Sequence, residues 1–195
     1  MPSFLRFSQL DTIHAPRRAF LGRSGALLSA SAVALLAGCE TLAAKNAAAA
    51  SGGSDVQILN TALGAELEAI AAYQLGADSG LLQPATKRLA LTFQGHHKAH
   101  ADVLASTVEK LGGVPVLAKP DYKFPVENLK AQADVLRFAA QLEKGAVSAY
   151  LGAVPLFDNR DLSKAAASIL GDEAMHWAVL RQALGEEPVP SAFMS

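Results

Sequence analysis

The sequence has 195 residues, which is enough for one domain with a sizeable buried core. Hydrophobic residues make up 51% of it but aromatic residues only 6%, and alanine is abundant, a composition that favours packed helices. The net charge of -1 excludes the basic excess with which proteins bind nucleic acid. The single cysteine excludes an internal disulfide framework and a multi-cysteine metal cluster.

Residues 1–39 have the pattern of an export signal, because arginines precede a short apolar stretch, Ala26–Ala37, that small residues follow. This stretch has about 12 residues, whereas a membrane-spanning helix needs roughly 20. Arg17 and Arg18, followed by Phe20-Leu21, resemble the twin-arginine motif, which exports proteins that often fold before they cross the membrane.

The signal ends in a candidate lipidation site. Residues 36–39 resemble a bacterial lipobox, in which Cys39 becomes the lipid-bearing first residue of the mature protein. Ordinary cleavage near Ala43 is the alternative. Residues 40–53 are rich in small residues and are predicted to form a flexible tether. The sequence therefore predicts an exported protein of the periplasm or cell envelope, anchored to the membrane through a lipid on Cys39.

Residues 54–187 have apolar residues at helical spacing in four segments, and residues 188–195 follow as a C-terminal tail. The first helix is expected to start at Ser54 or Asp55 as its cap and to stop at residues 78–80. The second is expected from Pro84, a residue suited to the first turn of a helix, to Leu111, with glycines behind it.

The third helix is expected over about residues 132–153, and the fourth from a cap at Asp161 or Ser163 to Gly185. Short turns within each pair predict antiparallel hairpins. The connection between the pairs is long enough to span roughly 40 Å, so it can cross from one end of the bundle to the other. The predicted fold is all-α, a four-helix bundle of two antiparallel hairpins joined by a long crossover.

Acidic and imidazole side chains occupy positions on the expected buried stripes. Two of the glutamates have a tyrosine seven residues later, Tyr73 and Tyr150, which are expected to pack with their hydroxyls against a glutamate. Counting from the turns at 1.5 Å per residue places six groups within about one helical turn of the same level. These groups are Glu66, His97, His100, Glu143, Glu173 and His176.

A buried, unpaired carboxylate costs several kcal/mol, so it must be neutralised, paired or bound to a metal. No lysine or arginine lies on these stripes at the level of the six groups. The sequence therefore predicts a metal site in the centre of the bundle.

Glu and Tyr on one helix with Glu-x-x-His on the next resemble the ferritin-like, rubrerythrin-type superfamily. The twin-arginine signal and the segment of residues 93–100, Phe-Gln-Gly-His-His-Lys-Ala-His, are similar to bacterial ferritin-like envelope proteins. The resemblance implies a ferritin-like bundle with Glu66 and Glu143 as terminal carboxylates and Glu173 as a bridging carboxylate. It also implies His100 and His176 as terminal imidazoles.

One position departs from the family pattern, which has Glu where this chain has His97. A neutral imidazole binds one metal through one nitrogen, so the loss of a bridging carboxylate favours a mononuclear or asymmetric site. Iron is the first choice, with manganese and zinc as alternatives. Glu68, Gln94, His96 and Asp102 are auxiliary candidates on poorer helical phases.

Two functions remain open. The first is a metal-binding envelope protein that oxidises Fe(II) or reacts with dioxygen or peroxide, which makes a small-molecule oxidant a partner. The second is a non-catalytic scaffold or stress-associated protein with a degenerate or metal-free core. The sequence leaves open whether the protein is an enzyme and whether it forms an oligomer.

Overall fold

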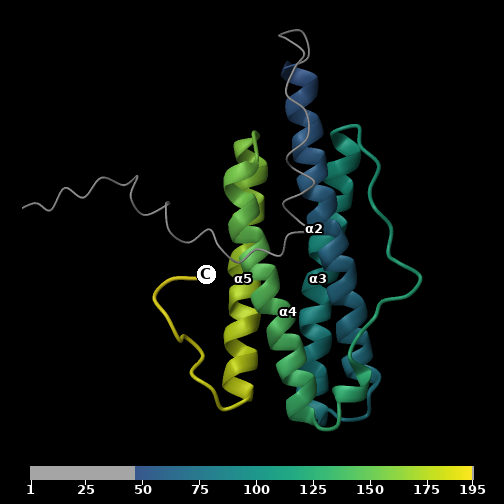
Figure 1. Ribbon diagram of the computed structural model, residues 1–195, viewed down its shortest axis with the longest axis vertical. Coiled ribbons are helices and arrows are strands. Elements are labelled where there is room, and N and C mark those ends of the chain that lie inside the picture. The colour runs from purple at the N-terminus through teal and green to yellow at the C-terminus, as the bar shows by residue number, and fades with distance from the viewer. Residues whose placement is uncertain (1–46, 195) are drawn as a thin grey trace, which may run out of the picture. The chain divides into compact units, whose positions relative to one another are not determined.

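The computed structural model describes residues 47–194, which form α-helices and short 3-10 helices without a strand (Figure 1). The predicted signal, including Arg17, Arg18 and Cys39, lies outside the described residues. None of the helices between residues 47 and 194 has the length and apolar character that crossing a membrane requires. The elements are α2 Ala47–Asp78, α3 Pro84–Lys110, η2 Val126–Asn128, α4 Gln132–Ala153, η3 Val154–Leu156 and α5 Arg160–Ala183.

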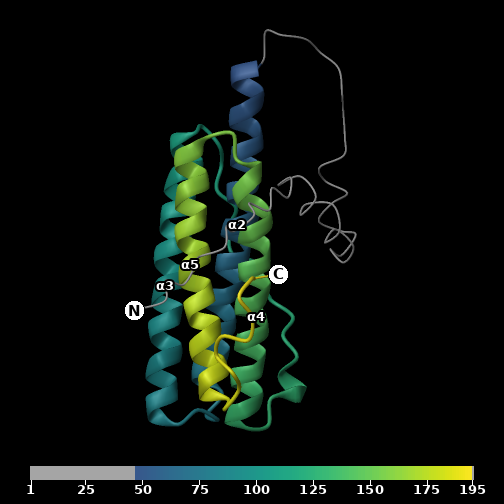
Figure 2. The same ribbon diagram turned by 90° about the vertical axis from the view of Figure 1, so that its left-hand side faces the viewer.

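The four α-helices form a bundle of two hairpins. Helix α2 packs along α3, α4 packs along α5, and α2 also contacts α4. The segment between α3 and α4 runs the length of the bundle, so that these two helices point in the same direction (Figures 1 and 2). The predicted all-α, two-hairpin bundle with a long crossover is therefore confirmed.

Most helix ends follow the residues that predicted them. Pro84 occupies the first turn of α3. Gly112 and Gly185 follow α3 and α5 with φ of 80° and 75°, a left-handed conformation that glycine adopts without strain. The cap of α5 differs from the prediction, because Asn159 Oδ1 accepts the backbone N–H of Asp161 at 2.8 Å.

Helix α2 begins at Ala47 instead of at Ser54, inside the segment predicted as a tether. Alanine has the highest helix propensity, and Ala47–Ala50 continue the helix backward (Figures 1 and 2). The predicted cap Asp55 is therefore an interior residue, and the prediction is wrong. Its buried carboxylate accepts the backbone N–H groups of Asp158 and Asn159 at 3.0 and 3.1 Å and fixes the start of α5.

The core has two apolar parts, one toward each end of the bundle. Glutamates and histidines lie between them along all four helices, at the level that helix geometry predicts. One part comprises Leu59, Leu63, Ala101, Leu104, Val108, Tyr150, Ala166 and Ile169. The other comprises Tyr73, Phe93, Leu136, Ala139, Ala140 and Leu180.

Candidate metal centre

The bundle brings all six predicted site residues together in its interior. Five of them are at most 3% exposed, and the side chain of His100 is 14% exposed. They come from all four helices, which is why no single segment of sequence contains the centre. The six are Glu66 on α2, His97 and His100 on α3, Glu143 on α4, and Glu173 and His176 on α5.

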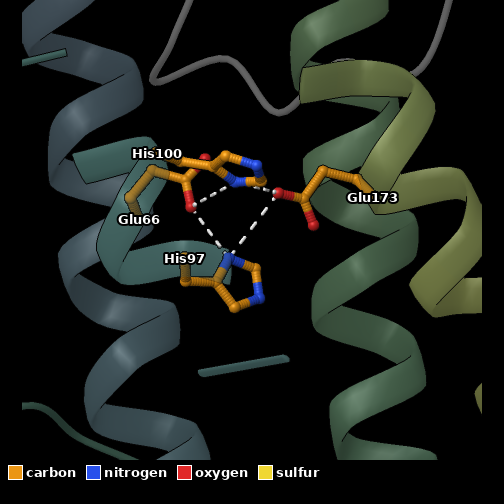
Figure 3. Close-up of side chains that lie close together, drawn as sticks. All are labelled: Glu66, His97, His100 and Glu173. Carbon is orange, nitrogen blue, oxygen red and sulfur yellow. Dashed lines mark hydrogen bonds and ion pairs between the residues drawn. The ribbon is translucent and has the colours of Figure 1, made fainter. Parts of the chain in front are cut away.

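Four of these side chains surround a first position that could hold a metal ion, and Figure 3 shows them pointing toward one another. Glu66 Oε2 lies 2.8 Å from His97 Nδ1 and 3.6 Å from His100 Nδ1. Glu173 Oε1 lies 3.6 Å from His97 Nδ1 and 3.1 Å from His100 Nδ1. Two carboxylates and two imidazoles thus alternate around the first position.

A second position lies beside the first and is fully buried. Glu143 Oε1 lies 3.3 Å from His97 Nε2 and 3.5 Å from His176 Nδ1. Glu173 Oε2 lies 3.3 Å from the same nitrogen of His176. The donors of the second position are again two carboxylates and two imidazoles.

The two positions share Glu173 and His97. Glu173 turns one carboxylate oxygen toward each position, and His97 turns Nδ1 toward the first and Nε2 toward the second. A carboxylate can serve two cations at once, whereas a neutral imidazole offers one lone pair. His97 therefore lies between the two positions, but its neutral imidazole can bind a metal at only one of them.

The tyrosines connect the two halves of the centre. The hydroxyl of Tyr73 on α2 donates to Glu143 Oε1 on α4. The hydroxyl of Tyr150 on α4 donates to Glu66 Oε1 on α2 at 2.5 Å. Each tyrosine thus orients the glutamate of the opposite helix. Tyr150 holds the Glu66 oxygen that faces away from the first position, whereas Tyr73 donates to the same Glu143 oxygen that faces the second position.

Three buried atoms of the centre make no hydrogen bond of ordinary geometry among the described residues: His100 Nδ1 and Glu173 Oε1, which lie 3.1 Å apart as an ion pair, and Glu143 Oε2. Buried polar atoms are rarely left without a partner, because an unmade hydrogen bond inside a protein costs about 1–3 kcal/mol. Oxygen and imidazole nitrogen atoms in this arrangement are the donors that iron, manganese and zinc accept. The centre therefore fits a metal ion.

The three histidines of the centre, His97, His100 and His176, have raised pKa values when no metal is bound. Burial opposes the charge of His97, but hydrogen bonds to Glu143 and Glu66 outweigh burial and raise its pKa to about 10. Burial likewise opposes protonation of the other two imidazoles, and hydrogen bonds to the glutamates raise the pKa of His100 and of His176 to about 9.

The glutamates respond in the opposite direction. Burial favours the neutral form of Glu66 and Glu143, but hydrogen bonds from the histidines outweigh it and lower the pKa of both carboxyl groups. The metal-free centre can thus balance its carboxylates with imidazolium ions. The sequence argument for a metal considered lysine and arginine as compensating cations but not charged histidine, which can also pair with these carboxylates.

Sequence reasoning overlooked Asp172. Its Oδ2 lies 3.3 Å from Nε2 of both His100 and His176, on the side of each ring that faces away from the centre. A carboxylate in this place fixes the orientation and tautomer of both imidazoles. Its position directly before Glu173 was the available signal.

The auxiliary candidates have different roles. His96 contacts Asp172 and His176. Gln94 is buried and donates to the carbonyl oxygen of Ile70, which ties α3 to α2. Glu68 and Asp102 belong to none of the possible metal-binding groups among residues 47–194.

Residues 54–186 match the family model of the ferritin-like domain. The chain belongs to the ferritin-like domain family. No curated protein matches the chain. The two hairpins and the crossover described above are thus those of a ferritin-like domain.

Solved structures resemble the ferritin-like domain in fold. A conserved hypothetical protein from Mycobacterium tuberculosis is 24% identical, with a TM-score of 0.64 over 73% of this chain and 99% of that one. A ferritin-like, diiron-carboxylate protein from Bacillus anthracis strain Ames is 21% identical, with a TM-score of 0.60 over 69% and 97%. A dodecameric thioferritin from Bacteroides fragilis is 21% identical, with a TM-score of 0.57 over 69% and 86%.

The placement of His97 between the two positions leads to a prediction about stoichiometry. Because its imidazole can serve only one of the two positions, wild type should bind closer to one Zn(II) per chain than two in an equilibrium titration. His97→Glu should raise the number toward two, and His97→Gln, which cannot bridge, should leave it near one. Two equally tight sites in wild type, or no gain in His97→Glu, would contradict the prediction.

Proposed function

We propose that this chain is an exported ferritin-like protein of the cell envelope that binds iron and oxidises Fe(II) with dioxygen or peroxide. The observation that carries the proposal is the buried centre of three carboxylates and three imidazoles, in which three atoms make no hydrogen bond of ordinary geometry. The diiron-carboxylate description of the Bacillus anthracis protein supports iron over manganese and zinc. The dodecameric Bacteroides fragilis protein supports assembly into an oligomer.

The chain's own residues suit this chemistry. Iron held by these ligands would supply the electrons for reduction of the oxidant. Glu66, Glu143 and Glu173 provide negative charge that stabilises a more highly charged metal, and Tyr73 and Tyr150 hold two of these carboxylates in place. The apolar clusters on either side exclude water from the centre.

Iron oxidation gives the direct test. Purified protein is loaded with Fe(II) without oxygen and then mixed with dioxygen or peroxide, and Fe(III) is followed by absorbance. Fe(II) should be oxidised faster with wild type than in protein-free buffer. Glu173→Gln should give only the rate of the protein-free buffer, because Glu173 serves both positions. Elemental analysis of protein from the native envelope fraction identifies the metal. Oxidation at the same rate in wild type, Glu173→Gln and buffer would refute the proposed activity.

A specific observation favours a second function, a non-catalytic scaffold. The three imidazoles have raised pKa values and face three carboxylates, so the centre can be neutral without a metal. A buried ionic network of this kind fixes the register of the four helices without any turnover. Envelope protein that contains no metal and does not oxidise Fe(II) would favour the scaffold.

Export and anchoring are part of the proposal and rest on the sequence motifs. Arg17→Lys combined with Arg18→Lys should leave the precursor in the cytoplasm. Cys39→Ser should move the mature protein from the membrane fraction to the soluble periplasmic fraction, because lipid chains on that cysteine provide the anchor. Fractionation followed by immunoblotting measures both. Membrane retention of the Cys39→Ser protein would contradict the lipid anchor.

A further inference from the structure

Two side chains outside the buried centre meet at its edge. His96 on α3 and Asp172 on α5 are 76 residues apart, the same separation as His100 and His176. They are therefore corresponding residues of the two hairpins. The side chain of His96 is 44% exposed and that of Asp172 is 22% exposed.

These two residues and His176 form a triangle of donor atoms. His96 Nδ1 lies 3.1 Å from Asp172 Oδ2 and 2.9 Å from His176 Nε2. The third side, from His176 Nε2 to Asp172 Oδ2, is 3.3 Å. Ligands about 2.1 Å from a cation lie about 3.0 Å apart in an octahedral set and about 3.4 Å apart in a tetrahedral one. All three separations fall at or near these values.

The chemistry of the triangle agrees with its dimensions. Two imidazoles and one carboxylate on one face of a cation leave the remaining coordination positions open and suit Fe(II), Co(II) and Zn(II). Among residues 47–194, this is the one possible metal-binding group that includes an exposed side chain. A cation at the triangle can therefore keep water ligands on its solvent side.

His176 connects the triangle to the buried centre. Its Nε2 faces His96, whereas its Nδ1 faces Glu143 and Glu173 at 3.5 and 3.3 Å. Phe93 stacks on the ring, with the two ring centroids 4.0 Å apart, so the ring is held in this orientation. A neutral imidazole binds through one nitrogen, so an outer cation and an inner cation compete for His176. Occupancy of the outer position is then transient.

We propose that His96, Asp172 and His176 form a solvent-facing site for a divalent cation, and that the buried centre is loaded through it. The loading role rests on the proposed metal-binding function, whereas binding at the outer site does not. The site captures the hydrated cation at exposed His96 and half-buried Asp172, and His176 is the ligand next to the buried positions.

The first test measures loading with Co(II), whose visible absorption reports its coordination. His96→Gln should slow the appearance of the buried Co(II) signal by about tenfold or more, because the local capture of cations is lost. The final stoichiometry and affinity of the buried centre should equal those of wild type. Asp102→Asn, an exposed carboxylate on the same helix, is the control and should load at the wild-type rate.

The second test isolates the outer site by removing a carboxylate from each buried position. The double variant Glu66→Gln with Glu143→Gln should still bind one Co(II) weakly, and adding His96→Gln should abolish this binding. If His96→Gln loads Co(II) at the wild-type rate and the double variant binds no Co(II), His96, Asp172 and His176 form only a hydrogen-bonded network. That result would refute the outer site. Lack of a buried Co(II) signal in wild type would refute the proposed function, and the double variant would still decide on the outer site.

Discussion

Fe(II), Mn(II) or Zn(II) should raise the thermal unfolding midpoint of the metal-free protein by about 8–16 °C. A ligand that binds only the folded state at a thousandfold excess over its dissociation constant stabilises by about 4 kcal/mol. For a domain of this size each kcal/mol corresponds to about 2–4 °C. The protein should remain folded in chelator, because the imidazolium ions balance the buried carboxylates. Scanning calorimetry with added metal and then with chelator measures the shift.

Variants locate the source of this stabilisation. Glu173→Gln should abolish the metal-induced shift, because this carboxylate belongs to both positions. Glu66→Gln and Glu143→Gln each disable one position, so the variant that loses the larger part of the shift identifies the occupied one. Glu68→Gln, on α2 but outside the centre, should keep the full shift. A midpoint that does not respond to metal or chelator in any of these proteins would rule out the metal centre and leave the scaffold.

The affinity for metal should rise by about 100-fold per pH unit between pH 6 and 8 if two protons leave per metal, since each contributes a factor of about ten. His97 has a pKa of about 10 and His100 and His176 of about 9 in the metal-free protein, so these imidazoles carry protons throughout this range. A metal can bind only when its ligand nitrogens are deprotonated. Isothermal titration calorimetry in buffers of different ionisation enthalpy counts the released protons.

Metal-free stability should show the opposite trend. Histidines with raised pKa values stabilise the fold fully below their unfolded pKa of 6.5, and this contribution is lost as the pH rises through about 9 to 10. Glu66 and Glu143 have lowered pKa values, so their contribution is present above 4.5 and is lost as the pH falls. These three histidines and two glutamates therefore favour the metal-free fold most between about pH 4.5 and 6.5. A metal affinity that does not change between pH 6 and 8, in the titrations described above, would contradict the protonation of these histidines.

Helical periodicity was sufficient to predict much of the centre. Along one helix, the rise per residue and the turn angle are fixed, so the level and face of Glu66 or Glu143 follow from counting. The backbone properties of proline and glycine correctly predicted that Pro84 begins a helix and that Gly112 and Gly185 end two others. These features depend only on residues close to one another in the sequence, so the sequence is sufficient to predict them.

Residues whose role depends on another helix were missed or misassigned. Asp55 was predicted to cap its own helix, but it accepts backbone N–H groups at the start of α5. Asp172 was not predicted at all, although it contacts His96, His100 and His176. The groups that Asp55 contacts, and the His96 and His100 rings that Asp172 contacts, are distant in the sequence, so helical periodicity along one segment does not reveal these contacts.

The sequence by itself determined the all-α bundle, its two hairpins and crossover, and the set of six polar residues at one level. The tertiary structure alone decided which atoms of these residues face one another. The two nitrogens of His97 face different metal positions. Each tyrosine of α2 and α4 donates to the glutamate of the other helix, and His96 is exposed to solvent at the edge of the centre. The physical reason is that periodicity fixes each helix about its own axis, whereas interatomic distances depend on helix packing and side-chain torsions.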